Sequence, residues 1–219
     1  MRTAMVLGVL GLAGALASPA FAKDEFTGFR LQANAGSETM NSKLSSAALN
    51  ATEDSDANRF AYGVGLGWAL NKYVAVELNL RSGSEYNTSQ FENVEVRPED
   101  YVASHLDLGG FEGSIVGSWW FNDHLSIFGR AGMFGWDATE LYSIGNDATQ
   151  TRPAAKVVHK ASDKGFEPLF GVGFQTVLDG ALMRVEYRYT EIGNLSKPGV
   201  FLLGSTKLSS LELSIVWTL

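Results

Sequence analysis

The chain has 219 residues, no cysteine and a formal net charge of −7. The lack of cysteine excludes disulfide cross-links and thiol chemistry, and the acidic balance argues against a nucleic-acid partner. The length suits one all-β domain or two small domains.

The first 22 residues have the pattern of a removable export signal. Arg2 gives a short basic start, residues 4–17 are apolar, and Ala20-Phe21-Ala22 forms a small-x-small cleavage site. We expect residues 1–22 to be cleaved and residues 23–219 to form the mature domain. No later stretch reaches the ~18–20 continuous apolar residues of a membrane helix. The mature chain is therefore either secreted and soluble, or it crosses a membrane as a closed barrel.

Apolar and polar residues alternate with the two-residue period of a β-strand along the mature chain. The pattern predicts strands over about 26–36, 60–70 and 74–81, with a polar stretch up to residue 58 and a short turn at Asn71-Lys72. The next strand begins after a polar stretch over about 82–101. Its apolar parity changes between Leu108 and Phe111, and we expect a β-bulge at Gly109-Gly110 to restore a single apolar face.

The second half of the chain continues the same rhythm. Strands are predicted over about 124–138, 166–178, 183–189 and 211–219, with long connections over 139–164 and 191–206 and short turns at Asn122-Asp123 and Asp179-Gly180. Connections that alternate long and short, together with an even strand number, are typical of bacterial outer-membrane barrels. The sequence thus predicts an all-β fold, an eight-stranded antiparallel up-and-down transmembrane β-barrel.

The alternation alone does not say which face is outside, and a soluble barrel of lipocalin type would invert it. The polar face favours the membrane barrel, because it is rich in small residues and nearly balanced in charge, as a narrow lumen requires. The residues expected to form a polar network in this lumen are Arg30, Glu77, Arg81, Glu112, Arg130, Gln175, Arg184, Glu186, Arg188 and Glu212. Satisfying buried polar groups is the simpler role for this network, and a conduction gate is the alternative.

Several runs resemble the transmembrane domain of OmpA-like outer-membrane proteins, over about residues 27–219. They are Asn71–Glu77, Leu125–Trp136, Phe170–Gln175, Arg184–Gly193 and the closing strand. The resemblance implies a membrane anchor whose lumen is blocked by salt bridges, with Glu77 and Arg184 as two members of the network. Val116 and Gln175 stand where the family has a lysine and a second glutamate, which argues against a family-type gate. Because the chain ends with the barrel, no cell-wall-binding domain is expected.

The closing strand carries a second implication of the resemblance. Its apolar face resembles the signal read by the outer-membrane barrel assembly machinery, although that signal usually ends in Phe or Trp. We expect this face to meet lipid and the strand to pair with the first strand near Phe29–Ala35. The residues of the assembly signal are Leu211, Leu213, Ile215, Trp217 and Leu219.

Catalytic and cofactor sites are not predicted. Some eight-stranded barrels deacylate lipid A with a Ser, His and acid set, and here His105 and Asp107 share one strand face. Ser104 lies on the other face, so the local triad fails. The acidic run Glu53–Asp56 lacks the spacing of a calcium loop. We expect no cofactor and no metal.

The third long connection is basic, and it supplies the candidate lipid contacts. If it is external, four of its residues could meet the phosphates of lipopolysaccharide, with a merely solvated loop as the alternative. These residues are Arg152, Lys156, Lys160 and Lys164. The expected partners are outer-membrane lipid, lipopolysaccharide and, during biogenesis, the barrel assembly machinery, and a monomer is expected.

The expected function is that of a non-catalytic barrel in the outer membrane of a Gram-negative bacterium. It would contribute to envelope integrity and surface exposure, with weak porin-like permeability to small solutes. Two alternatives stay open: an adhesin or receptor that works through external loops, and a lipid-modifying enzyme. Loss of binding on loop deletion would favour the first, and hydrolysis of lipid A by purified protein would favour the second.

Overall fold

The computed structural model describes residues 27–46, 51–83, 85–92, 100–146, 156–178, 180–193 and 203–219. No helix in these ranges is long and apolar enough to span a membrane. Nine strand segments follow in chain order: β1 (Gly28–Ser46), β2 (Ala51–Ala69), β3 (Val74–Gly83), β4 (Tyr86–Glu92), β5 (Asp100–Trp120), β6 (Leu125–Asn146), β7 (Lys156–Leu178), β8 (Ala181–Ile192) and β9 (Leu203–Thr218). The predicted signal segment, residues 1–22, lies outside the described residues.

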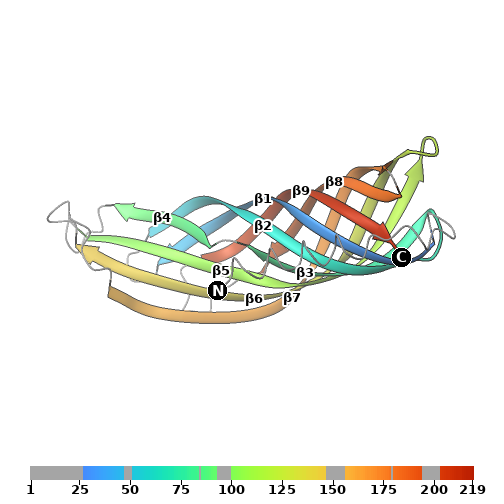
Figure 1. Cartoon of the computed structure of the whole chain (residues 1–219). Coiled ribbons are helices and arrows are strands. Elements are labelled where there is room, and N and C mark those ends of the chain that lie inside the picture. Colours follow the sequence, from blue (N-terminus) through green and yellow to red (C-terminus); the bar gives the residue numbers. More distant parts are fainter. Residues whose placement is uncertain are drawn as a thin grey trace.

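The strands form one closed antiparallel sheet. Their order is β3-β2-β1-β9-β8-β7-β6-β5-β4, and β3 also pairs with β5. Since β3 and β4 both pair with β5, they share one place in the wall. The result is the predicted eight-stranded up-and-down barrel, drawn from the side in Figure 1. Such closure leaves no open backbone edge in the lipid.

The pairing of β1 with β9 closes the barrel. Leu31 lies opposite Trp217 and Ala35 opposite Leu213, and the backbone N–H of Leu219 donates to the carbonyl of Phe29 at 2.8 Å. This is the pairing predicted for the last strand. The final residue of the sequence is thereby held in the wall.

Three tight turns join the strands at one end, here called the turn end. The chain turns in the same way at Asn71 and at Asn122. In each turn the asparagine Oδ1 accepts hydrogen bonds from the backbone N–H groups two and three residues later, at 2.8–2.9 Å. Gly180 takes a φ of 78° in the third turn, where an L-residue with a side chain would be strained. The predicted turns at Asn71-Lys72 and Asn122-Asp123 are confirmed, and in the third turn Leu178 pairs with Ala181, whereas Asp179 lies outside the described residues.

At the other end, here called the loop end, the predicted connections were too long. β1 continues to Ser46 and β2 begins at Ala51, so much of the first polar stretch is strand. The polar stretch 82–101 contains β4, and β6 and β7 reach far into the connection predicted over 139–164. Figure 1 shows β4 to β7 running on past the other strands on the left. These extensions carry polar residues on both faces, so no apolar alternation reveals them.

The predicted bulge at Gly109-Gly110 is wrong. β5 pairs with β6 in one unbroken register from Asp100 to Trp120. The irregularity lies on the neighbouring strand, where five steps from Arg81 to Tyr86 match four steps from Gly110 to Leu106. Leu106 and Leu108 therefore point inward and are fully buried, whereas Phe111 and Ile115 point outward. The change of parity marks apolar residues inside the barrel.

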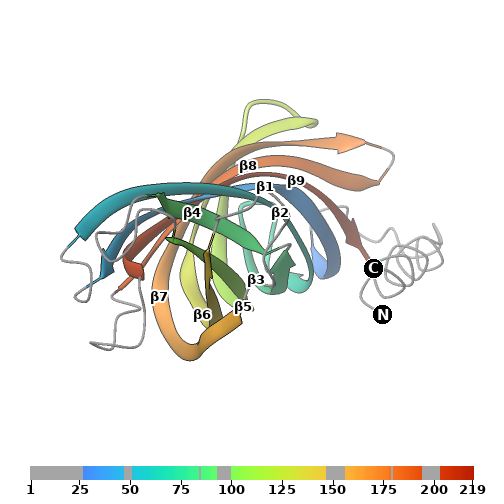
Figure 2. The ribbon, with the colours of Figure 1, turned by 90° about the vertical axis from the view of Figure 1, so that its left-hand side faces the viewer.

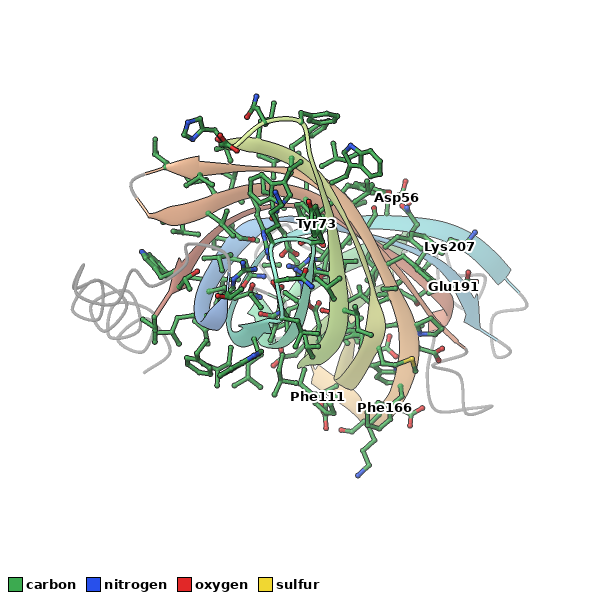
Figure 3. The ribbon with its side chains drawn as sticks, turned by 90° about the vertical axis from the view of Figure 1, so that its right-hand side faces the viewer. Asp56, Tyr73, Phe111, Phe166, Glu191 and Lys207 are labelled. Carbon is green, nitrogen blue, oxygen red and sulfur yellow. The ribbon has the colours of Figure 1, made fainter. Side chains whose placement is uncertain are left out.

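The outer wall carries a broad apolar belt. Large side chains such as Trp68, Leu80, Ile115, Val172 and Leu213 are all about half exposed or more. On β7 the apolar stretch from Phe166 to Leu178 rises ~30 Å at a strand tilt near 40°, which matches the hydrocarbon core of a bilayer. A polar row borders the belt toward the loop end, where Lys207 lies opposite both Glu191 and Asn41, and Asn41 opposite Asp56 (Figure 3).

Beyond the belt the strand pairing divides into two groups, although β2 still contacts β4. β1, β2 and β9 remain paired with one another, and β4 to β7 form the other group. Figure 2 looks onto the loop end and shows β1 and β2 above, with β5, β6 and β7 below. From Asp137 to Asn146, β6 adds ~20–25 Å to the height of the barrel.

Candidate functional site

The interior of the barrel is the candidate site, because it holds the residues that the sequence singled out. Side chains alternate between the two faces of each strand, so charged residues on six strands, β1, β3, β5, β6, β8 and β9, project into the same narrow space. Each predicted network residue is at most 7% exposed. They are Arg30, Glu77, Arg81, Glu112, Arg130, Gln175, Arg184, Glu186, Arg188 and Glu212.

The half of the network nearer the turn end is centred on Arg130 and Glu77. Arg130 donates from Nε to Glu186 at 2.6 Å and from Nη2 to Glu77 at 2.9 Å, and Nη1 reaches Ser114 at 2.7 Å. The second carboxylate oxygen of Glu77 accepts from Arg184 at 2.7 Å. Strands far apart in the sequence are thus cross-linked through the lumen by charge-assisted hydrogen bonds.

A like-charge contact explains the position of Arg188. Glu186 on β8 lies directly opposite Glu212 on β9, an arrangement that repels when nothing lies between the two carboxylates. Arg188 donates a hydrogen bond to Glu112 at 2.7 Å and forms ion pairs with Glu186 at 3.0 Å and with Glu212 at 3.2 Å. One guanidinium therefore holds three carboxylates together.

The half nearer the loop end contains residues that the sequence reasoning missed. Glu38 accepts from Arg59 at 2.6 Å and also from Arg81 and the Tyr86 hydroxyl, and the Arg59 guanidinium lies 4.4 Å from the centre of the Tyr86 ring. Arg81 continues the chain of contacts to Glu112 at 2.9 Å and to Glu212. Glu38 has the same parity as Arg30 and Asn34, so a longer first strand would have identified it.

The two positions that depart from the OmpA-like pattern have separate roles. Gln175 accepts a hydrogen bond from Nε of Arg184 at 2.9 Å and donates to Ser118 at 3.0 Å, so it continues the network without a charge. Val116 is buried with Ala69, Ala75 and Phe128 in an apolar cluster. The Arg184 guanidinium lies 5.1 Å from the centre of the Phe128 ring, which joins the network to this cluster.

Apolar residues lie on both sides of the network along the barrel. Toward the turn end, the inward position next to Glu77 is Ala75 and the one next to Arg130 is Phe128. Toward the loop end many inward positions become apolar again, beginning with Met40 after Glu38, and Ser42, Glu140 and Thr206 are buried among them. The loop-end layer comprises Met40, Tyr86, Leu106, Leu108, Phe134, Trp136, Ala138, Leu169, Ile192 and Leu208, each no more than 6% exposed.

The side chains of these layers are almost fully buried. A cavity of about 10 Å³ lies among Arg81, Arg188 and Leu169. A volume of this size is near the minimum for one water molecule. The arrangement therefore offers cross-strand bonding and a blocked lumen, and the described residues contain no cluster of His, Asp and Glu that could hold a metal ion.

The remaining predicted residues lie elsewhere on the molecule. Leu211, Leu213 and Ile215 face outward from β9, and Trp217 and Leu219 at its end are half-buried. Lys164 is exposed on β7, Lys156 and Lys160 belong to the same strand, and Arg152 lies outside the described residues.

The residues considered for catalysis belong to a single strand. Ser104, His105 and Asp107 lie in β5 toward the loop end, with Asp107 half-buried on the outward parity.

Comparison with solved structures gives distant likenesses. Ail of Yersinia pestis is 10% identical with a TM-score of 0.45, and the match covers 87% of this chain and 99% of that one. Neisserial surface protein A is 13% identical with a TM-score of 0.49 over 88% and 98% of the two chains. OprG of Pseudomonas aeruginosa is 12% identical with a TM-score of 0.45 over the same shares.

Sequence comparison is more informative at the level of the family. No curated protein matches this chain significantly. The family model described as "Outer membrane protein beta-barrel domain" matches residues 8–206, which is most of the chain. With the closed barrel and its apolar belt, this match shows that the chain belongs to the outer-membrane β-barrel family and is a protein of the outer membrane.

Proposed function

We propose that this protein is a sealed, non-catalytic anchor that supports the integrity of the envelope and carries surface-exposed strands. The observation that carries the proposal is the filled lumen, in which the Arg and Glu network lies between two apolar layers. In this proposal the loop end faces outward and both mature termini face the periplasm, as the short turns and long connections of the family imply.

A sealed interior favours the anchor over the weak porin activity that the sequence left open. An ion entering the lumen would have to displace guanidinium groups that each bind two or more carboxylates, as Arg81 and Arg188 do. It would also have to pass layers of largely apolar side chains, which solvate an ion poorly. The purified barrel in a planar bilayer should therefore show no steady conductance, and channels of defined size would overturn the sealed-lumen proposal.

The role in the envelope calls for a test in cells. A deletion strain should become more sensitive to detergent and to large antibiotics, and the intact gene should restore resistance. A variant with the outer ends of β6 and β7 shortened, by removing residues 143–157, should restore it equally well. If the deletion strain and the strain that carries the intact gene are equally sensitive, the protein does not support envelope integrity.

An adhesin or receptor is the second candidate, and the projecting strands favour it. β5, β6 and β7 extend well beyond the apolar belt, which is more wall than a membrane anchor requires. The same shortened variant separates the two roles, because an adhesin would lose cell or ligand binding while envelope resistance stays intact.

The lipid-modifying enzyme is the less favoured alternative. Asp107 lies on the outward face of β5, and the neighbouring Ser104 has the opposite parity. Incubation of the purified protein with lipid A should release no fatty acid. Release that disappears in a His105→Ala variant would overturn the non-catalytic assignment.

Processing and lipid partners are further parts of the proposal. We expect the membrane-extracted protein to begin at Lys23, which N-terminal sequencing would check. Lipopolysaccharide retained through purification, and lost on substitution of Lys156, Lys160 and Lys164, would support the lipid contacts.

A further inference from the structure

The loop-end part of β7 has a partner on only one of its sides among the described residues. β6 stays in register with β7 as far as Lys156, apart from one irregularity between Tyr142 and Ser143. β8 pairs with β7 only from Leu169 to Leu178, with Leu169 opposite Thr190. Residues 160–166 of β7, here called the open edge, therefore extend from the border of the apolar belt toward the loop end, with no strand of the described part of the chain registered beside them.

Pro168 explains why the ladder between β7 and β8 stops there. Its carbonyl points toward β8, because the Thr190 hydroxyl donates to it at 2.8 Å. The N–H and C=O of one residue point to the same neighbouring strand in an antiparallel sheet, and proline has no N–H to donate. The ladder thus loses its next hydrogen bond at this residue.

The same alternation places backbone groups on the open edge. Odd-numbered residues of β7 bond to the β6 side, as the N–H of Val177 does to the carbonyl of His124 at 2.9 Å. Even-numbered residues point the other way, so Lys160, Ser162, Lys164 and Phe166 direct their N–H and C=O groups away from β6. These are the groups that an added strand would bind.

Carboxylates already take the place of a strand at this position. The N–H of Lys164 donates to the side chain of its neighbour Asp163 at 2.9 Å. The N–H of Gly193, just after β8, donates to the side chain of Glu167 at 3.2 Å. Side chains of this kind can move aside when a backbone acceptor arrives.

The side chains beside the open edge indicate the kind of partner. Lys164 is exposed, and Phe166 is 63% exposed and held by Phe111, whose ring centre lies 5.5 Å away in an edge-to-face contact (Figure 3). Two copies of this edge would bring lysines together, which disfavours self-pairing. A strand with an acidic residue beside Lys164 and an apolar residue beside Phe166 would fit.

We propose that the open edge of β7 is a docking site for an extended acidic peptide, which adds as a further strand by backbone hydrogen bonding. The backbone would supply much of the affinity, and Lys164 and Phe166 the selectivity. This inference goes beyond the anchor role, because a sealed barrel performs that role with the edge empty.

The test uses the full-length protein in lipid nanodiscs and a synthetic nine-residue peptide that alternates threonine with glutamate and carries one phenylalanine. Hydrogen exchange should slow at residues 160–166 when the peptide is added. A peptide of the same sequence with alternate backbone nitrogens methylated should bind about tenfold more weakly or worse, because it cannot donate to the edge. Equal binding by both peptides, or no change in exchange, would overturn the proposal.

Variants separate the peptide from other occupants. Asp163→Ala should bind the peptide severalfold more tightly because the competing carboxylate is gone, whereas the matched Ser162→Ala variant should bind as the parent does. Lys164→Glu should weaken the acidic peptide and strengthen its lysine counterpart. Lipopolysaccharide that protects the same amides in place of the peptide, or a dimer joined through this edge, would show that the edge serves another partner.

Discussion

Arg188 is the residue on which most of the lumen's electrostatic balance depends. It lies between the facing carboxylates of Glu186 and Glu212 and also binds Glu112. Arg188→Met keeps much of the side-chain volume but leaves these carboxylates uncompensated, so we expect a loss of ~3–5 kcal/mol in the free energy of unfolding. Urea titration of the protein in lipid vesicles would measure it.

The control for this prediction is a cation that lies on the surface. Lys164 is exposed on β7, so Lys164→Met should change the unfolding free energy by no more than ~0.5 kcal/mol. Similar losses in both variants would contradict the account of the network, because solvent would then be screening Arg188 as well.

A second residue-scale prediction concerns Gly135, which lies on β6 between two aromatic rings. A Cβ at this position would come within 2.7 Å of the Phe111 ring and 2.8 Å of the Phe166 ring. Gly135→Ala should therefore cost ~1–3 kcal/mol through overpacking and disturb the ring contact. Gly113→Ala on β5 is the matched control, since a Cβ there would meet nothing within 4 Å. Partial recovery in a Gly135→Ala/Phe111→Ala double variant would identify the clash as the cause.

At the scale of the strand, β9 tests which face meets lipid. Leu213 is 63% exposed on the outer wall, and its neighbour Glu212 is buried in the lumen. Leu213→Arg should destabilise the barrel by ~2–4 kcal/mol in a bilayer, because it places a charge in hydrocarbon. The same substitution should lower the unfolding free energy much less in detergent, which forms a thin and mobile layer around the barrel. Equal losses of unfolding free energy in bilayer and detergent would mean that Leu213 lies outside the membrane.

The sequence was informative about strands where one face meets lipid and the other meets the lumen. β3 was predicted almost to its ends, since Val76, Leu78 and Leu80 alternate with Glu77, Asn79 and Arg81. The outer half of β2 was missed because residues such as Glu53 and Asp54 show no apolar period. The outer half of β2 is held in place by its cross-strand pairing with β1.

At the scale of the whole molecule, the alternation of connection lengths was enough to predict a closed barrel. The interior was harder to predict, because an apolar residue in a barrel strand can face lipid or fill the lumen. Leu106 and Leu108 illustrate the ambiguity: their parity differs from that of Phe111, and the structure uses them to fill the loop-end layer. Charged residues carried no such ambiguity, which is why the central network was predicted and the apolar layers were not.

Three layers in series make a final prediction about the sealed lumen. The loop-end layer, the ion-pair network and the cluster around Phe128 each block the same path. Removing large side chains from one layer should not open the lumen. A Phe134→Ala/Trp136→Ala variant should therefore show no conductance in a planar bilayer, although the barrel loses stability. Combining it with Phe128→Ala and Arg130→Ser should give measurable conductance, provided that the protein keeps the faster gel mobility of a folded barrel before boiling. Conductance in the first variant would mean that the network and the cluster around Phe128 do not close the lumen without an intact loop-end layer.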